Sequence, residues 1–198
     1  MNNNKNIFWN SILKNSLVVG IMMMLSKIIE TKMLMNAASG MGLYTIEMLV
    51  VFSAFIYLLV RYTKNYRTAL MEQMSEPKEF TFGQGFRFIV MLCIISSIII
   101  TLGNYIYVHK CIGYQTYLNE ISNALKQYIA SAPNAGGAMG TIDQLMSRMR
   151  ALPEPGILKE IWSGIWSYAF YGAFLGIIIA ASLKKGASLS KNEDDDDI

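Results

Sequence analysis

The stretch Ile161-Trp-Ser-Gly-Ile-Trp-Ser-Tyr-Ala-Phe-Tyr-Gly-Ala-Phe-Leu-Gly-Ile-Ile-Ile-Ala-Ala-Ser-Leu183 contains no charged residue. A second uncharged stretch covers residues 88–108. A helix crosses the ~30 Å hydrocarbon core of a bilayer with about 20 apolar residues, because it rises about 1.5 Å per residue. Both stretches are long enough, so the sequence predicts an integral membrane protein that has the lipid bilayer as its first partner.

Two further apolar stretches each contain one ionisable residue. Lys14 interrupts residues 6–26, and Glu47 interrupts residues 33–60. A lysine near a helix end can extend its side chain to the lipid headgroups, so Lys14 does not exclude a span. We therefore predict one membrane domain, residues 1–185, followed by an acidic disordered tail, residues 186–198. The four predicted spans cover residues 7–27, 41–61, 87–108 and 161–183.

The composition supports an all-α fold, an integral membrane four-helix bundle. Hydrophobic residues make up 53% of the chain and charged residues only 16%, unlike an average soluble domain. With so few charges, the net charge of +3 gives no reason to expect a nucleic-acid partner. The longest polar segment, residues 112–156, lies between the third and fourth spans and is predicted to form an extramembrane helical hairpin.

The distribution of Lys and Arg predicts the orientation. With a cytoplasmic N-terminus, 10 of the 17 basic residues fall on the inner side. Arg61, Lys64 and Arg67 directly follow the second span, and Lys184 and Lys185 follow the fourth, where basic residues influence topology most. We therefore predict that both termini are cytoplasmic and that the hairpin lies outside.

The hairpin segment contains two amphipathic patterns. Tyr114, Tyr117 and Leu118 begin one apolar stripe at helical spacing, and Ile142 and Leu145 begin another. Two such helices cannot bury their stripes alone in about 50 residues. Each stripe must face the bilayer surface, the other helix or a partner protein.

Three short motifs resemble one bacterial membrane-protein family. They are Gly42-Leu-Tyr-Thr-Ile-Glu-Met-Leu49, Arg61-Tyr-Thr-Lys-Asn-Tyr-Arg67 and Phe80-Thr-Phe-Gly-Gln-Gly-Phe86. Together they resemble the four-span family called domain of unknown function 4199. The resemblance implies a Gram-negative inner-membrane protein and suggests a membrane glycosyltransferase as a candidate partner. It supplies no catalytic residues, and Glu47 departs from the apolar residue expected at its position.

The glycines in Phe80–Phe86 do not form a nucleotide loop. The segment lacks the Lys and Ser/Thr that hold a nucleotide, and no strand precedes it. We interpret it as a re-entry turn with aromatic residues at the membrane interface.

Few residues are suited to chemistry. The single histidine, His109, and the two cysteines, Cys93 and Cys111, cannot build a typical zinc site, and no Ser, His and acid arrangement suggests hydrolysis. We expect no metal, no cofactor and no enzymatic activity.

Helix packing is the remaining signal. Gly172 and Gly176 form a GxxxG motif, which Gly164 and Ala180 extend along one face of the fourth span. The third span carries a polar line, Cys93, Ser97, Thr101 and Asn104, for which internal helix contacts are the simpler explanation and a substrate path the alternative.

Glu47 is the one carboxylate expected within the membrane. We predict that it faces the bundle and contacts Asn104 or Lys27, as a structural group rather than a proton site. The function expected from these features is a non-enzymatic accessory or scaffold subunit, bound to a membrane-protein partner or to a second copy of the chain. The alternative is a small transporter or lipid translocator, which would need ionisable groups around a cavity at mid-membrane.

Overall fold

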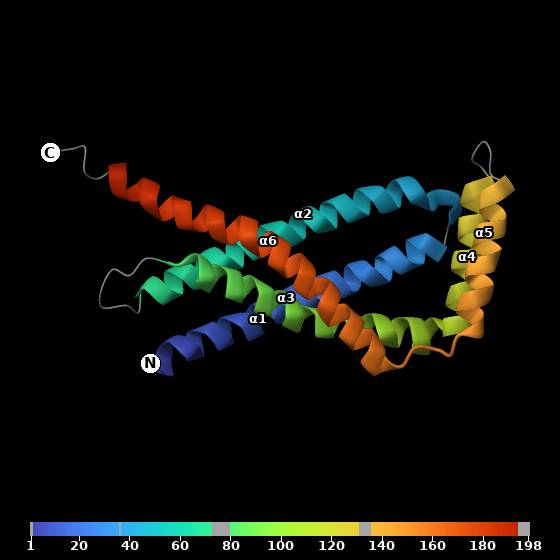
Figure 1. Ribbon diagram of the computed structural model, residues 1–198, viewed down its shortest axis with the longest axis horizontal. Coiled ribbons are helices and arrows are strands. Elements are labelled where there is room, and N and C mark those ends of the chain that lie inside the picture. Colours follow the sequence, from blue (N-terminus) through green and yellow to red (C-terminus); the bar gives the residue numbers. More distant parts are fainter. Residues whose placement is uncertain (1, 36, 73–79, 131–135, 194–198) are drawn as a thin grey trace. The chain divides into compact units, whose positions relative to one another are not determined.

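The computed structural model describes residues 2–35, 37–72, 80–130 and 136–193 (Figure 1). Within these ranges the chain forms helices and no strand, which confirms the predicted all-α class. Residue 186, where the acidic tail was predicted to begin, falls within the last helix, and residues 194–198 lie outside the described ranges. The helices are α1 (Asn2–Met35), α2 (Ala37–Glu72), α3 (Phe82–Tyr105), the π-helix η1 (Ile106–Ile112), α4 (Tyr114–Ala130), α5 (Gly136–Ala151) and α6 (Ile157–Glu193).

Four helical segments are long and apolar enough to cross a membrane. They are Lys5–Met35, Leu43–Glu72, Phe82–Ile112 and Ile157–Lys184. The helices are longer than the predicted spans, because a helix satisfies its own backbone hydrogen bonds and need not end where the hydrocarbon ends. The remaining helices, α4 and α5, come from the segment predicted to form the extramembrane hairpin.

The chain divides into two compact units. Unit 1 consists of Met1–Ile21, Ser53–Ile99 and Trp162–Ile198, and unit 2 consists of Met22–Phe52 and Ile100–Ile161. Helices α1, α2, α3 and α6 therefore contribute to both units, whereas α4 and α5 belong wholly to unit 2.

Close contacts at glycines hold the helices of unit 1 together. A Cβ placed on Gly172 of α6 would lie 2.8 Å from Cβ of Cys93 on α3, and a Cβ on Gly20 of α1 would lie 2.9 Å from Cβ of Ile99. Real Cβ atoms do not approach so closely, so only glycine permits this spacing. Helices in a bilayer gain no hydrophobic free energy by associating, because lipid is as apolar as their side chains. Small residues let the helices approach closely, so that van der Waals contacts stabilise their association.

In unit 2, a change of helix type and a glycine redirect the chain before α4. The N–H of Gly113 donates to the carbonyl of Val108 at 3.0 Å, which closes the last turn of η1. Gly113 then takes a φ of 91°, a left-handed conformation that a residue with a Cβ rarely adopts. Helix α4 begins at the next residue.

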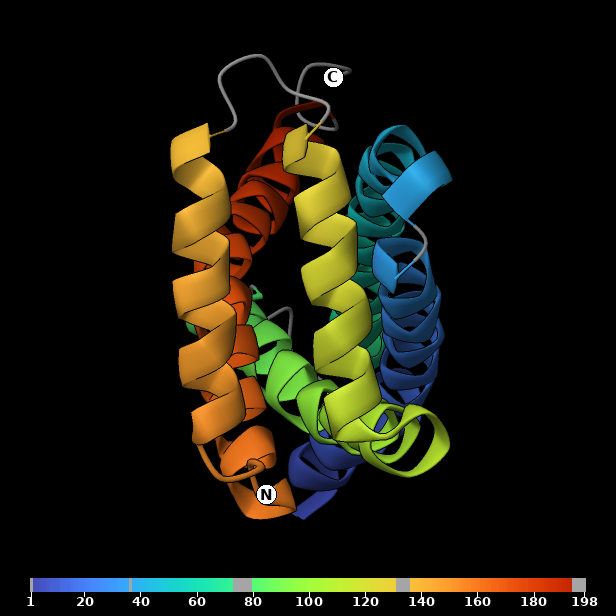
Figure 2. The same ribbon diagram turned by 90° about the vertical axis from the view of Figure 1, so that its right-hand side faces the viewer.

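Helices α4 and α5 lie side by side in opposite directions, as Figure 2 shows. Leu118 and Ala124 of α4 and Ile142 and Met146 of α5 are buried. The sequence allowed these stripes to face the bilayer surface, the other helix or a partner protein. The structure shows that these four residues are buried where the two helices pack against each other.

Polar contacts join the same pair of helices. Nζ of Lys126 lies 2.5 Å from Oδ1 of Asp143, and Nη2 of Arg150 donates to Oδ1 of Asn119 at 2.8 Å. These contacts fix the register of the hairpin, because each joins one residue of α4 to one of α5.

Candidate functional site

The predicted small-residue face of α6 is turned towards its own chain. Gly172, Gly176 and Ala180 are buried, and Gly164 is half-buried. A Cβ on Gly176 would meet the ring of Phe86 at 3.2 Å. Gly172 and Gly176 therefore bring α6 onto α3 inside unit 1, and the part of this face around them is not an open surface for a partner.

The predicted polar line on α3 crosses the boundary between the two units. Ser97 is buried in unit 1 and donates its hydroxyl to the carbonyl of Ile94 at 2.7 Å, within its own helix. Thr101 and Asn104 belong to unit 2, and Thr101 is buried. Oδ1 of Asn104 is buried and has no hydrogen-bond partner among the described residues. The Ser97 hydroxyl thus forms its hydrogen bond within its own helix, as serines in membrane helices often do. The side-chain oxygen of Asn104 accepts no hydrogen bond from the described residues.

Glu47 has a different partner from those predicted. Oγ of Ser26 on α1 donates to its Oε1 at 2.5 Å, so the expected contact with Asn104 or Lys27 was wrong. Lys27 instead pairs with Glu30 at 2.7 Å, because three residues along a helix bring two side chains together without any long-range contact.

The hydroxyl of Tyr44 also donates to Glu30, at 3.1 Å. Two carboxylates thus tie α1 to α2 in unit 2, since Glu30 reaches Tyr44 and Glu47 reaches Ser26. Each of these carboxylates already has a donor, which fits the structural role expected of Glu47.

His109 is the centre of a cluster that the sequence did not reveal. Its ring stacks between Tyr105, at a centroid distance of 4.1 Å, and Tyr114, at 5.0 Å, and its Nδ1 pairs with Glu154. The ring joins η1, the start of α4 and the segment after α5. Tyr105 and His109 are four residues apart, which is one signal that could have shown the stack.

The described residues contain no group of three or more His, Cys, Asp or Glu side chains that could hold a metal ion. The surroundings of the cluster raise the pKa values of two tyrosines, Tyr114 and Tyr117. Burial raises the pKa of Tyr114, and Glu160 and Glu154 raise it further. Burial also raises the pKa of Tyr117, together with the negative charges of Glu30 and Glu160.

The α5 side of the hairpin keeps an apolar stripe that α4 does not cover. Leu145 of α5 is 52% exposed, and Leu152, the residue directly after the end of α5, is 65% exposed. Met149, which is half-buried, lies between them at helical spacing. A contiguous exposed apolar patch outside the spans is suited to a partner or to lipid.

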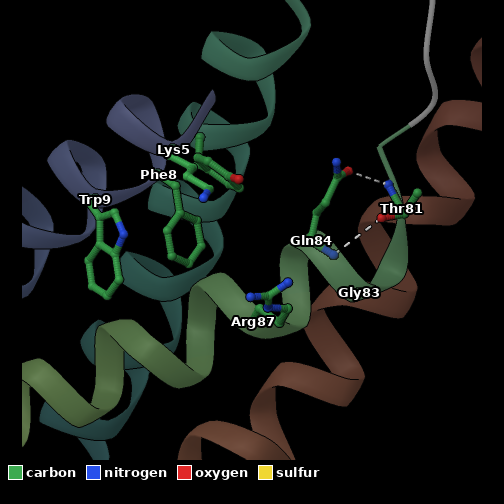
Figure 3. Close-up of a pocket in the computed structure, with 8 residues that line it drawn as sticks. Lys5, Phe8, Trp9, Thr81, Gly83, Gln84 and Arg87 are labelled. Carbon is green, nitrogen blue, oxygen red and sulfur yellow. Dashed lines mark hydrogen bonds between the residues drawn. The ribbon is translucent and has the colours of Figure 1, made fainter. Parts of the chain in front are cut away.

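Unit 1 contains a cavity of about 560 Å³ (Figure 3). Lys5, Phe8 and Trp9 line it from the start of α1, and Arg87 lines it from the first turns of α3. Its remaining lining residues are Tyr66, Thr81, Gly83 and Gln84. The cavity thus combines basic, aromatic and uncharged polar groups, which suits a ligand with an anionic head and an apolar body.

The edge of this cavity is the capped beginning of α3. The N–H of Thr81 donates to Oε1 of Gln84 at 2.9 Å, and the N–H of Gln84 donates to Oγ1 of Thr81 at 3.4 Å. This reciprocal pair is a capping box. The interpretation of Phe80–Phe86 as a re-entry turn was wrong from Phe82 onward, because the Thr-x-x-Gln spacing starts a helix there.

A family model described as "Protein of unknown function (DUF4199)" matches residues 14–185. The chain belongs to this family. The resemblance inferred from the three motifs is therefore confirmed. No curated protein and no solved structure matches the chain.

The DUF4199 match includes the described parts of α2 to α5 and most of α1 and α6. It covers the hairpin with Leu145 and Leu152 and the side of the cavity formed by α3. It begins after Lys5, Phe8 and Trp9, so the α1 side of the cavity lies outside the matched region.

Proposed function

We propose that this chain is a non-enzymatic accessory or scaffold subunit of the bacterial inner membrane, with both termini in the cytoplasm and the α4–α5 hairpin on the outer side. Four helices that can span a membrane support the membrane location. The distribution of Lys and Arg supports the orientation. The observation that carries the accessory role is the exposed apolar stripe of Leu145 and Leu152 on the hairpin.

This stripe belongs to a preformed surface. The Lys126 to Asp143 and Arg150 to Asn119 contacts hold α5 in place against α4, so little conformational freedom remains to be lost on binding. Burying the two leucines against a partner would contribute roughly 25 cal/mol per Å² of apolar area removed from water. A membrane glycosyltransferase is the candidate partner suggested by the family resemblance, and a second copy of the chain is the other.

The test is purification of the tagged full chain in mild detergent. Leu145→Glu with Leu152→Glu places two charges on the stripe, while Gln144→Glu with Ser147→Glu adds the same charge at exposed polar positions of the same helix. We expect the wild type and the polar-position variant to co-purify with a stoichiometric membrane protein or to form a dimer. The leucine variant should neither retain the partner nor dimerise. Equal retention by both variants, or no stoichiometric species with the wild type, would remove the accessory role.

Asn104 favours a second candidate, a small transporter or lipid translocator. A buried amide oxygen that has no partner among the described residues, in a helix that can span a membrane, is available to a substrate that donates a hydrogen bond. Proteoliposomes containing the chain would then move a fluorescent phospholipid between leaflets faster than empty liposomes, and Asn104→Leu would abolish the difference. Equal rates with and without the protein would exclude this candidate.

A further inference from the structure

The cavity of unit 1 contains two cations that no carboxylate neutralises within the described part of the chain. Lys5 and Arg87 come from different helices, are exposed, and line the same cavity. The three ion pairs found among the described residues involve neither of them. Two cations that line one cavity and have no carboxylate partner among the described residues raise the local positive potential, which favours an anion.

The backbone at the beginning of α3 adds donors to this edge of the cavity. The first four N–H groups of a helix have no carbonyl partner inside the helix. The capping box satisfies those of Thr81 and Gln84, whereas none of the hydrogen bonds between described residues uses those of Phe82 and Gly83. A Cβ on Gly83 would meet no atom within 4 Å, so a ligand can approach this backbone closely.

Aromatic rings form the apolar part of the cavity. Phe8 packs edge-on against both Trp9 and Tyr66, and Tyr66 stacks on Phe88 at a centroid distance of 4.5 Å. This stack fixes the ring of Tyr66, which is only 5% exposed. The cavity, at about 560 Å³, is within the usual size range of small-molecule sites and has room for more than a bare ion.

We propose that this cavity binds a phosphate ester, with the phosphate between Lys5, Arg87 and the first turn of α3 and the organic part against the aromatic rings. Three kinds of donor from two helices, the Lys5 ammonium of α1 and the Arg87 guanidinium and backbone N–H groups of α3, suit the several oxygens of a tetrahedral phosphate better than the two oxygens of a planar carboxylate. The macrodipole of α3 adds attraction for the same charge. The phosphate can belong to an anionic phospholipid or to a soluble phosphate monoester, since both present this group.

The test uses the full chain purified in detergent and measures binding by native mass spectrometry and by ligand-induced thermal stabilisation. One arm adds phosphatidylglycerol, a second adds glycerol 3-phosphate, and phosphatidylcholine is the zwitterionic reference. The cavity variant is Lys5→Gln with Arg87→Gln. The matched control, Lys14→Gln with Arg61→Gln, removes the same charge from exposed positions of unit 1 outside the cavity lining.

We expect saturable binding of at least one anionic ligand to the wild type and to the control, and binding weakened roughly tenfold per cation lost in the cavity variant. Binding in the lipid arm alone identifies a phospholipid, and binding in the soluble arm alone identifies a small phosphate ester. Gly83→Ala, which changes no charge and has room for a methyl group, should weaken binding a few-fold because the ligand meets the new Cβ. Equal affinities in the cavity and control variants, or no binding in either anionic arm, would overturn the proposal.

Discussion

Units 1 and 2 are stabilised by different interactions. In unit 1, α1 and α6 meet α3 at glycines, and two polar contacts between helices end on backbone carbonyls: Ser96 donates to the carbonyl of Ser16 at 3.1 Å, and Arg67 donates to that of Leu183 at 3.2 Å. In unit 2, Gly103 also lies close to the side chain of Met24, but carboxylates make many of the polar contacts, and the three salt-bridge contacts found among the described residues all lie there.

This difference indicates how each unit should respond to change. Close packing depends on side-chain volume, so unit 1 should be sensitive to added atoms. Ion pairs and buried hydroxyls depend on protonation, so unit 2 should be sensitive to pH and to the loss of single polar groups.

The largest effect is expected from Gly172→Leu. A Cβ at this position would already lie 2.8 Å from Cβ of Cys93, and the rest of a leucine has no space between α6 and α3. Overpacking of this kind costs about 1–3 kcal/mol or more. We expect a large fall in thermal stability in detergent, or no folded protein.

Ala181→Leu is the control for this substitution. Ala181 is exposed on the same helix, so a leucine there should change the stability little. If Gly172→Leu melts at the wild-type temperature, α6 does not pack on α3 as described.

A smaller effect is expected from His109→Ala. This change removes the stacking on Tyr105 and Tyr114 and the pairing with Glu154. Aromatic pairs contribute about 0.5–1.5 kcal/mol each, so the loss should be about 2 kcal/mol and should loosen the hairpin. Hydrogen exchange of α4 and α5 amides would report the loosening.

His109→Phe separates the two contributions, because phenylalanine keeps a ring between the tyrosines and removes the pairing. We expect its exchange rates to lie between those of the wild type and His109→Ala. Equal rates for all three proteins would show that the ring does not hold the hairpin.

The smallest effect concerns alkaline pH. The pKa of Tyr117 is raised from 10.0 in the folded protein. The stability that this tyrosine contributes is therefore fully present below about pH 10 and is lost as the pH rises through its folded pKa. Tyr117→Phe should lessen the fall of the unfolding temperature between about pH 9 and about pH 11. The same fall in both proteins would contradict the burial of this hydroxyl.

The four spans could be predicted from the sequence, because a run of about 20 residues with few or no charges can be recognised without knowing the fold. The close packing at Gly172 was also accessible, since spacing by four places small residues on one face. The partner of Glu47 was not accessible, because Ser26 lies on another helix and no pattern distinguishes it from its neighbour Lys27.

The helix start at Thr81 and Gln84 was predicted wrongly for a different reason. The capping-box spacing is present in the sequence, but the glycines beside it suggested a turn. The cavity followed neither from spacing nor from composition, since Lys5 and Arg87 come together only through the packing of separate helices.

The central claim is that Arg61, Lys64 and Arg67, which follow the second span, lie in the cytoplasm and that the α4–α5 hairpin lies on the outer side of the membrane. Single cysteines at Thr68 on α2 and at Ser147 on α5, both exposed, test it in a background with Cys93→Ser and Cys111→Ser. With a membrane-impermeant maleimide on intact cells, we predict labelling of Ser147→Cys, and labelling of Thr68→Cys only after the membrane is permeabilised. Labelling of Thr68→Cys in intact cells, with Ser147→Cys protected, would contradict the account.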